Sequence, residues 1–339
     1  MKNSQPLLAI TMGDPAGIGP EITLKALLAL SDMQLCRIFV IGDIYPLQSA
    51  ADSLGITEKL YVIDSAEAVM PGRMNVMDMN IINSGNKVIT GKVQANCGTA
   101  AYEYIIKAIG LAMAESVDAI VTCPINKEAL KMAGINYPGH TEILADKTGT
   151  SDFSMMFACD NVSVVHVTTH VSLKNAITMI TQERILSHTR LLNRALKNLG
   201  ITSPRIAVSG LNPHAGENGL FGDEEIIHIA PAVESAKKEG INASGPYPPD
   251  TVFMRAFKGE FDGIVSMLHD HGFVALKSRD FGSGVNITLG LPIIRTSVGH
   301  GTAFDIAGKN IASEKSLMAA VNAAVKMAAN KTNQARKLA

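Results

Sequence analysis

The sequence predicts an α/β fold with two lobes, and two observations carry this prediction. Short apolar runs rich in β-branched residues alternate with longer stretches whose apolar residues recur at helical spacing, which is the pattern of parallel strands joined by crossover helices. The chain has 339 residues, of which 47% are hydrophobic, enough for a large core that is usually divided between two lobes. We therefore expect two α/β lobes.

The early elements follow in chain order. Residues 7–12, 38–41 and 119–122 are short apolar runs and are predicted to be buried strands. Residues 93–115 are predicted to form a helix. Its buried stripe consists of Cys97, Ala101, Tyr104, Ala108 and Leu111. A second helix is predicted before Gly200, with Ile185, Leu192, Leu196 and Leu199 on its buried stripe. These helices are expected to cover the faces of the sheets.

Three later strands are each predicted to end near a histidine. Residues 164–170, 205–214 and 263–270 begin as apolar runs and lead to His170, His214 and His269. Open α/β sheets bind ligands at the carboxyl edge of their strands, and three imidazoles that converge there can hold a divalent metal with one position open for substrate. A single histidine at a strand end is more often a hydrogen-bonded packing residue. The metal hypothesis therefore depends on three histidines occurring in matching positions.

Charge and cysteine content narrow the classes of function. Lysine and arginine total 30 against 31 acidic residues, for a net charge of -1, which gives no bias toward nucleic acid or an anionic membrane surface. Cys36, Cys97, Cys123 and Cys159 include no C-x-x-C pair, as expected of reduced thiols in a cytoplasmic protein. No run approaches the ~20 apolar residues of a membrane span, and the first ten residues are too weakly basic for a secretory signal. We expect a soluble, cytoplasmic protein.

A glycine-rich segment follows the first predicted strand. Residues 13–21 read GDPAGIGPE, and the amides of such a turn could cradle an anion or a nucleotide. Gly17 and Gly19 are spaced like the first two glycines of G-x-G-x-x-G, but Pro20 starts a helix where the fingerprint needs two more residues and a third glycine. A tight strand-to-helix turn is an equally good interpretation.

Positive charge gathers late in the chain. The borders of predicted strands carry three cationic residues, Lys277, Arg279 and Arg295, and one amide, Asn286. Such residues are often only solvated strand ends. Arginine nevertheless offers a bidentate fork for carboxylate or phosphate, and lysine offers a point charge. Gly282 and Gly284 favour an anion site, because backbone without side chains allows a ligand to approach closely.

Four strings of residues carry a specific resemblance. They are GDPAGIGPE at residues 13–21, PGHTE at 138–142, GLNPHAGE at 210–217 and GVNITLGLP at 284–292. In this order they resemble the 4-hydroxythreonine-4-phosphate dehydrogenase family, and the resemblance extends from residue 7 to about residue 327. It implies an isocitrate/isopropylmalate-dehydrogenase-like fold of two α/β lobes with an active-site cleft between them. It also implies a homodimer with shared active sites, one divalent metal per site and NAD as hydride acceptor.

The resemblance also implies roles for individual residues. His170, His214 and His269 match the family's metal ligands, which come from two subunits, and the metal is expected to be zinc, cobalt, manganese or magnesium. The residues that match substrate-binding positions are His140, Thr141, Lys277, Asn286 and Arg295. Asp250, Asp270, His140 and Lys277 are the expected proton-relay or catalytic groups. No residue is assigned to the cofactor, and NAD rather than NADP rests on the resemblance alone.

The lobes are expected to divide near Pro124, although no Ser-rich or Pro-rich linker marks the boundary. Residues 1–124 and 283–339 are predicted to form the first lobe, which includes both termini. Residues 125–282 are predicted to form the second lobe, with the metal ligands and the dimer interface. Residues 330–339 are expected to be a solvent-exposed tail.

Such a site supports a two-step reaction. Oxidation of a secondary hydroxyl by NAD gives a ketone, and a carboxylate β to that ketone is then readily lost as carbon dioxide. The predicted function is oxidation of the C3 hydroxyl of a 4-phosphorylated four-carbon acid followed by decarboxylation. The resemblance implies 4-phospho-D-threonate or 4-phospho-D-erythronate as the expected substrate, with dihydroxyacetone phosphate and carbon dioxide as the expected products.

Two departures from the family pattern bear on the substrate. His271 stands where members of the vitamin B6 pathway carry glutamine, and residues 11–14 read Thr-Met-Gly-Asp where they carry Thr-Pro-Gly-Glu. These changes indicate a second branch that acts on phosphorylated sugar acids. We hypothesise that His271 helps to select a C2 hydroxyl over an ammonium group, and neutral drift at this position is an equally good explanation.

Three alternative functions remain open from the sequence. The first is the 4-hydroxythreonine-4-phosphate dehydrogenase of pyridoxal phosphate biosynthesis. A phosphate acyltransferase could share the fold without needing three metal-binding histidines, so metal dependence separates it from a dehydrogenase. A non-catalytic sensor of phosphorylated sugar acids would use the cationic residues alone and bind without turnover.

Overall fold

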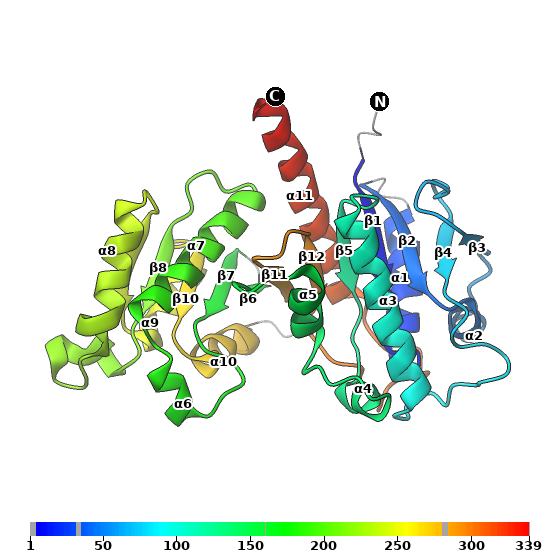
Figure 1. The fold of residues 1–339 in the computed structure, drawn as a ribbon, viewed down its shortest axis with the longest axis horizontal. Coiled ribbons are helices and arrows are strands. Elements are labelled where there is room, and N and C mark those ends of the chain that lie inside the picture. The colour runs from blue at the N-terminus through cyan, green and yellow to red at the C-terminus, as the bar shows by residue number, and fades with distance from the viewer. Residues whose placement is uncertain (1–4, 32–34, 160, 280–283, 339) are drawn as a thin grey trace. The chain divides into compact units, whose positions relative to one another are not determined.

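The computed structural model describes residues 5–31, 35–159, 161–279 and 284–338. The chain divides into two compact units. Unit 1 consists of residues 1–151 and 291–339, and unit 2 consists of residues 152–290. Each unit combines a β-sheet with covering helices (Figure 1), so the predicted α/β class is confirmed.

Unit 1 is built on a parallel sheet with the strand order β3-β4-β2-β1-β5-β12. Its strands are β1 (Leu7–Thr11), β2 (Arg37–Gly42), β3 (Leu60–Ile63), β4 (Met74–Asp78), β5 (Ala119–Thr122) and β12 (Arg295–Val298). Strands β1 and β5 are buried at every position, as expected of parallel strands covered on both faces. The three early strands predicted from apolar runs are thereby confirmed.

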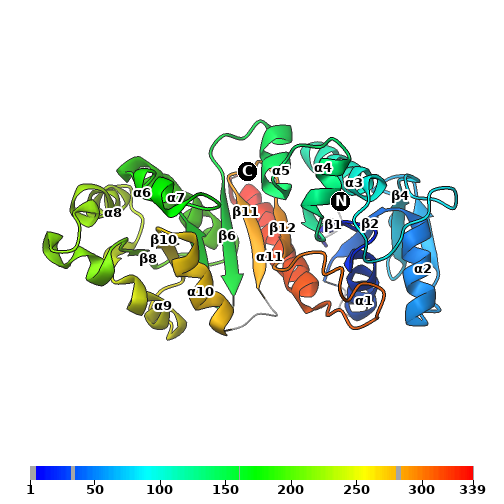
Figure 2. The ribbon, with the colours of Figure 1, turned by 90° about the horizontal axis from the view of Figure 1, so that it is seen from below.

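The helices of unit 1 cover both faces of this sheet. They are α1 (Gly19–Ser31), α2 (Ile44–Leu54), α3 (Ala95–Met113), α4 (Lys127–Met132), α5 (His140–Thr148) and α11 (Lys315–Leu338). Figure 2 shows α1, α2 and α11 on one side and α3 with α4 on the other. The predicted stripe of α3 is buried at Cys97, Ala101, Tyr104 and Ala108, while Leu111 is half-buried at its edge.

Unit 2 is built on a mixed sheet with the strand order β11-β6-β7-β10-β8-β9. Its strands are β6 (Ser154–Cys159), β7 (Val162–His166), β8 (Ile206–Ser209), β9 (Ala243–Tyr247), β10 (Gly263–Ser266) and β11 (Val285–Leu289). Strands β7, β10, β8 and β9 are parallel, whereas β6 pairs antiparallel with both β7 and β11. The three histidine-bearing runs therefore lead out of three neighbouring parallel strands.

The helices of unit 2 also lie on both faces of the sheet (Figure 2). They are α6 (Leu173–Thr178), α7 (Gln182–Asn198), a 3-10 turn η1 (Pro213–Gly219), a π-helical turn η2 (Glu225–Ile229), α8 (Ala230–Lys238), α9 (Pro249–Phe257) and α10 (His269–Arg279). Helix α7 is the second predicted helix. It buries Ile185, Leu192 and Leu196, and Leu199 follows as its half-buried C-cap.

The boundaries between the units differ from those expected near residue 124 and residue 283. The segment after Pro124 stays with unit 1, because α5 packs against α3 and buries Ile143 and Leu144 in that unit's core. At the second boundary, β11 pairs with β6 and stays in unit 2 as far as Gly290. Side-chain packing and strand pairing, rather than a change in composition, therefore mark the boundaries.

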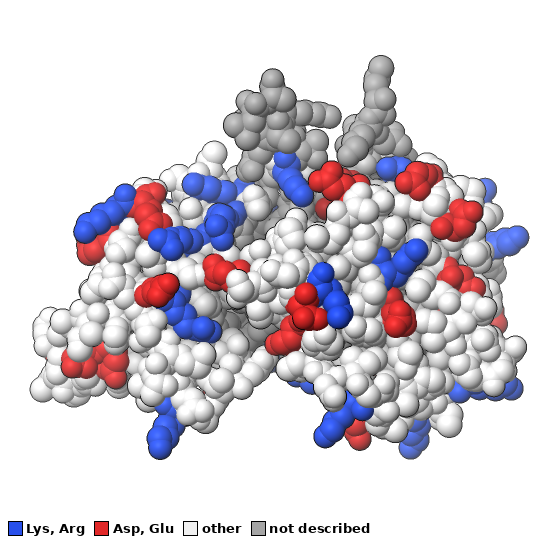
Figure 3. All heavy atoms as spheres, in the orientation of Figure 1, with Lys and Arg blue, Asp and Glu red and all other residues white. Residues whose placement is uncertain are grey.

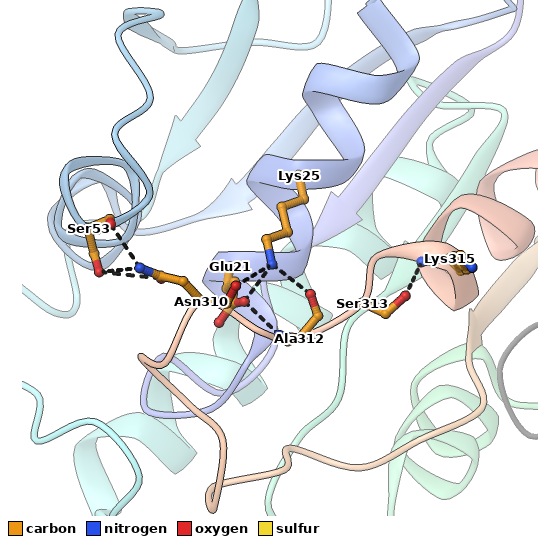
Figure 4. Close-up of polar contacts among 7 residues, drawn as sticks. All are labelled: Glu21, Lys25, Ser53, Asn310, Ala312, Ser313 and Lys315. Carbon is orange, nitrogen blue, oxygen red and sulfur yellow. Dashed lines mark hydrogen bonds and ion pairs between the residues drawn. The ribbon is translucent and has the colours of Figure 1, made fainter.

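A long irregular segment of unit 1, residues 299–314, is tied to α1 and α2 (Figure 4). The Lys25 ammonium group donates to the carbonyl oxygens of Asn310 and Ala312, at 3.1 and 2.7 Å, and to Glu21 Oε1 at 2.8 Å. Glu21 Oε1 also accepts from the Ala312 amide at 2.8 Å, and Asn310 Nδ2 donates to the Ser53 carbonyl at 2.8 Å. The last residue of the GDPAGIGPE string thus anchors a loop far along the chain.

Cys97, Cys123 and Cys159 are buried free thiols and Cys36 is half-buried; burial raises the pKa of Cys97 and Cys123 to about 12. Within the part of the chain that the structure describes, no helix is both long and apolar enough to cross a membrane. Residues 330–338, expected to be a tail, continue α11, and residue 339 lies outside the described residues.

Candidate active site

The three predicted metal-ligating histidines lie at the carboxyl edge of the unit 2 sheet. Strands β7, β10 and β8 are neighbours and parallel, so their carboxyl ends lie along one edge. His170 follows β7, His269 follows β10 and His214 follows β8. The position predicted for these histidines, each past the end of a different strand, is confirmed.

The structure brings two of the three histidines together. The ring centroids of His170 and His269 are 5.7 Å apart. His269 is the first residue of α10, and its Nδ1 forms a 2.8 Å hydrogen bond with Asp270 Oδ1. An ionised carboxylate accepts from Nδ1–H, which leaves Nε2 of His269 as the nitrogen that can bind a metal. Two imidazoles, one of them oriented by a carboxylate, fit a divalent cation.

His214 lies apart from this pair. It belongs to η1, 68% of its side chain is exposed, and its Nδ1 is 3.5 Å from Glu217 Oε2. No group of three potential metal ligands is formed among the residues that the structure describes. Convergence of all three imidazoles is therefore not found within one described chain, because the loop after β8 presents His214 to solvent.

His166 and Phe273 support the His170–His269 pair. The His166 ring is stacked on Phe273 at 4.7 Å, and Phe273 lies 4.6 Å from the His269 ring. Burial, followed by the charge of His269, lowers the pKa of His166 to about 3, so this imidazole is neutral at pH 7. Gly272 leaves room for it, since a Cβ there would lie 2.2 Å from His166 Nε2. Sequence reasoning missed both supports; the only signal was a histidine inside an apolar strand.

The other predicted residues of unit 2 lie on three elements. Asp250 is exposed in the first turn of α9, and Asp270 is exposed beside His269. Lys277 lies on α10 with its ammonium nitrogen 5.0 Å from the Phe273 ring centroid. Asn286 is half-buried on β11. Lys277 and His269 thus both lie beside the Phe273 ring.

Gly282 and Gly284 are the two glycines that are expected to favour an anion site. Gly282 lies outside the described residues. Gly284 is required by packing, since a Cβ there would lie 2.0 Å from Phe157 Cζ. Packing against Phe157 therefore explains its small size, and its part in an anion site stays a prediction.

Unit 1 carries the other predicted substrate-binding residues. His140 and Thr141 begin α5, and Arg295 begins β12. Only 3% of Arg295 is exposed, and its Nε and Nη2 donate to Thr122 Oγ1 at 3.2 and 2.6 Å. Thr122, which sequence reasoning missed, lies at the end of β5, where a threonine after an apolar strand was the available signal. Arg295 of the cationic cluster thus belongs to a different unit from Lys277 and Asn286.

Arg295 and His140 differ in their charge at neutral pH. Burial lowers the pKa of Arg295 to about 9, so the guanidinium group is still charged at pH 7. Burial and then the charge of Arg295 lower the pKa of His140 well below its ordinary value. A neutral imidazole close to a fixed cation can accept a hydrogen bond, while the guanidinium group can pair with an anion.

The glycine-rich segment is a tight turn whose amides are largely used internally. The Asp14 amide donates to the Pro124 carbonyl at 2.9 Å, and the Ile18 amide donates to the Thr302 carbonyl at 3.0 Å. The Ala16 amide donates to the Asp14 carboxylate at 2.8 Å, and the Gly17 amide donates to the Asp14 carbonyl at 3.1 Å. These bonds favour the strand-to-helix turn over an anion cradle.

The charged side chains on one face of the molecule are of mixed sign. On the face drawn in Figure 3, lysine and arginine are interspersed with aspartate and glutamate over both units. This distribution agrees with the net charge of -1.

Comparison with known proteins gives matches along nearly the whole chain. A family model described as "Pyridoxal phosphate biosynthetic protein PdxA" matches residues 34–324. The D-threonate 4-phosphate dehydrogenase of Pectobacterium atrosepticum is 46% identical over 325 residues, 95% of this chain and 99% of that protein. The 4-hydroxythreonine-4-phosphate dehydrogenase of Beijerinckia indica is 48% identical over 322 residues, 94% of each chain.

A solved structure agrees with these sequence matches. The crystal structure of 4-hydroxythreonine-4-phosphate dehydrogenase from Klebsiella pneumoniae has a TM-score of 0.83 and 44% identity, and covers 96% of this chain and 100% of that chain. The isocitrate-dehydrogenase-like α/β fold expected from the resemblance is thereby confirmed.

Proposed function

Because this chain belongs to the PdxA family of dehydrogenases, we propose that it is a metal-dependent, NAD-linked, decarboxylating dehydrogenase of a 4-phosphorylated four-carbon acid. The proposed substrate is 4-phospho-D-threonate or 4-phospho-D-erythronate. The alternative substrate is 4-hydroxythreonine-4-phosphate, which the name of the Beijerinckia indica relative indicates. His271, and Met12 with Asp14, favour the sugar acids because they depart from the vitamin B6 pattern.

The proposed reaction balances in two steps. The C3 hydroxyl loses its proton to a base, and C3 loses a hydride that reduces NAD⁺ to NADH. The resulting ketone is β to the carboxylate, so the C1–C2 bond can break with release of carbon dioxide, and its electron pair remains on an enolate. A proton added at C2 then yields dihydroxyacetone phosphate.

Residues of unit 2 are proposed to hold the metal. His170 and His269 would supply two imidazoles, and Asp270 would hold His269 in the tautomer that presents Nε2. The resemblance implies ligands from two subunits of a homodimer, and the proposal takes the third imidazole, His214, from the second copy because it lies apart from the pair. A divalent cation bound there would make the substrate hydroxyl more acidic.

The other predicted residues are proposed to bind the substrate and move protons. Arg295, Lys277 and Asn286 would pair with the carboxylate and phosphate, and Thr141 would add a hydroxyl donor. His140 is neutral at pH 7 and can therefore accept a hydrogen bond from a substrate hydroxyl. The proton-relay groups of the proposal are Asp250, Asp270, His140 and Lys277.

One observation carries the proposal. His170 and His269 lie together beyond the carboxyl ends of β7 and β10, with Asp270 bonded to His269, in a chain that matches named dehydrogenases over 94–95% of its length. A phosphate acyltransferase or a sensor would have no use for a carboxylate-oriented histidine pair of this kind. This pair therefore supports metal-assisted oxidation over acyl transfer or simple binding.

The experiment measures NADH formation by absorbance with purified, metal-loaded protein. It compares 4-phospho-D-threonate, 4-phospho-D-erythronate and 4-hydroxy-L-threonine phosphate, each with and without chelator. Chelated protein reloaded with metal is the control, because recovered activity separates metal loss from unfolding. A chelator-sensitive signal on the sugar acids, with release of carbon dioxide, would support the proposal. A signal favouring the amino acid would support the alternative, and no signal on any substrate would overturn both.

A further inference from the structure

The loop that carries His214 has an unusual backbone. Residues His214, Ala215, Gly216, Glu217 and Asn218 all have positive φ, at 54°, 53°, 79°, 44° and 57°. Residues other than glycine disfavour this left-handed region, because their Cβ atom crowds the following carbonyl oxygen. Five such residues in succession persist only if the surrounding structure holds them there.

A buried carboxylate holds the entrance to this loop. Only 3% of Glu225 is exposed. Its Oε1 accepts from the amides of Leu211 and Asn212 at 2.7 and 2.8 Å, and its Oε2 accepts from Asn212 Nδ2 at 2.9 Å. Charge-assisted hydrogen bonds of this kind are stronger than neutral ones. Glu225 therefore fixes the two residues from which the chain turns toward His214.

The same carboxylate lies against the loop on both sides of His214. A Cβ on Gly210 would lie 3.0 Å from Glu225 Oε1, and a Cβ on Gly216 would lie 2.8 Å from Oε2. The loop backbone thus packs directly on the carboxylate, with no side chain between them. Glu225 opens a π-helical turn, an irregularity that is frequent at functional sites.

We propose that Glu225 is a positioning residue for His214. Its carboxylate holds residues 210–216, and with them the start of the left-handed turn of residues 214–218, in the conformation that presents the His214 imidazole for metal binding. This inference rests on the proposed function, in which His214 supplies the third imidazole. It adds to that function a residue that contacts neither metal nor substrate.

The test measures binding of Co²⁺ alone to the full-length protein, by competition with a chromogenic chelator and by the visible spectrum of the bound ion. Glu225→Gln keeps the shape but puts an NH₂ group among donors, so Co²⁺ affinity should fall by about 10- to 100-fold, the usual effect of disturbing a ligand's support. The Co²⁺ spectrum should change as it does in His214→Ala. Glu224→Gln is the matched control and should bind Co²⁺ like the wild type, because Asn212 keeps its bonds to Glu225.

A second variant covers the case in which Glu225→Gln does not fold. Gly216→Ala presses on the carboxylate from the loop side and should cause the same loss of affinity with Glu225 intact. If either folded variant binds Co²⁺ like the wild type while His214→Ala does not, the inference is wrong and the proposed metal site stands. If His214→Ala itself binds Co²⁺ like the wild type, the proposed ligand is wrong and the inference fails with it.

Discussion

The anchor between Glu21 and the segment of residues 299–314 allows a quantitative prediction. Only 4% of Glu21 is exposed, and its Oε1 accepts from Lys25 Nζ and from the Ala312 amide, both at 2.8 Å (Figure 4). Glu21→Ala would remove both bonds. It would leave the Ala312 amide without its acceptor and Lys25 without its counter-charge.

The size of the effect follows from these contacts. Hydrogen bonds to a charged group contribute about 1.5–3 kcal/mol each, so losing two costs about 3–6 kcal/mol. Lys25 keeps its two carbonyl acceptors, and 22% of its side chain reaches solvent, which reduces the loss. We therefore expect Glu21→Ala to lower the free energy of unfolding by about 3 kcal/mol. Glu21→Gln keeps one acceptor oxygen and should cost less, about 1–2 kcal/mol.

Urea denaturation followed by circular dichroism measures this free energy, and hydrogen exchange at the Ala312 amide reports on the anchor itself. A loss of about 3 kcal/mol corresponds to exchange faster by about 100-fold. Asp52→Asn is the matched control, because Asp52 forms an exposed contact with Gln48 on α2 and should change stability by less than about 0.5 kcal/mol. If Glu21→Ala unfolds like the control and exchange at Ala312 is unchanged, the reasoning about this anchor is wrong.

Three further predictions concern other sites. Burial raises the pKa of Asp14 from 3.8 to about 6, so the stability that it contributes is present below pH 3.8 and is lost as the pH rises to about 6; Asp14→Asn should flatten this part of the stability curve in urea titrations. Gly272→Ala should destabilise by about 1–3 kcal/mol in thermal melts, because its Cβ would overlap His166. Gly110→Ala, with nothing within 4 Å, should stabilise by about 0.5–1 kcal/mol, and equal effects would contradict this. His271→Gln should shift kcat/KM toward 4-hydroxy-L-threonine phosphate by about tenfold, and an unchanged preference would remove the proposed role of His271.

The elements could be predicted because their signals are local. Parallel strands buried on both faces need apolar runs, and covering helices need an apolar stripe every three to four residues. Both patterns involve residues that are close together in the sequence. The sequence therefore predicts β1, β5, α3 and α7 at the positions where the structure has them. The unit boundaries could not be predicted in this way, because they depend on α5 packing on α3 and β11 pairing with β6.

The candidate site divides along the same line. The sequence by itself determined which histidines follow strand ends, since that depends only on the order of residues along the chain. Only the tertiary structure decided that His170 and His269 meet while His214 lies apart, because strand order in the sheet and the left-handed turn after β8 set those positions. The role of Glu225 could not be predicted from the sequence for the same reason. Its hydrogen bonds to residues 211 and 212 join segments that only folding brings together.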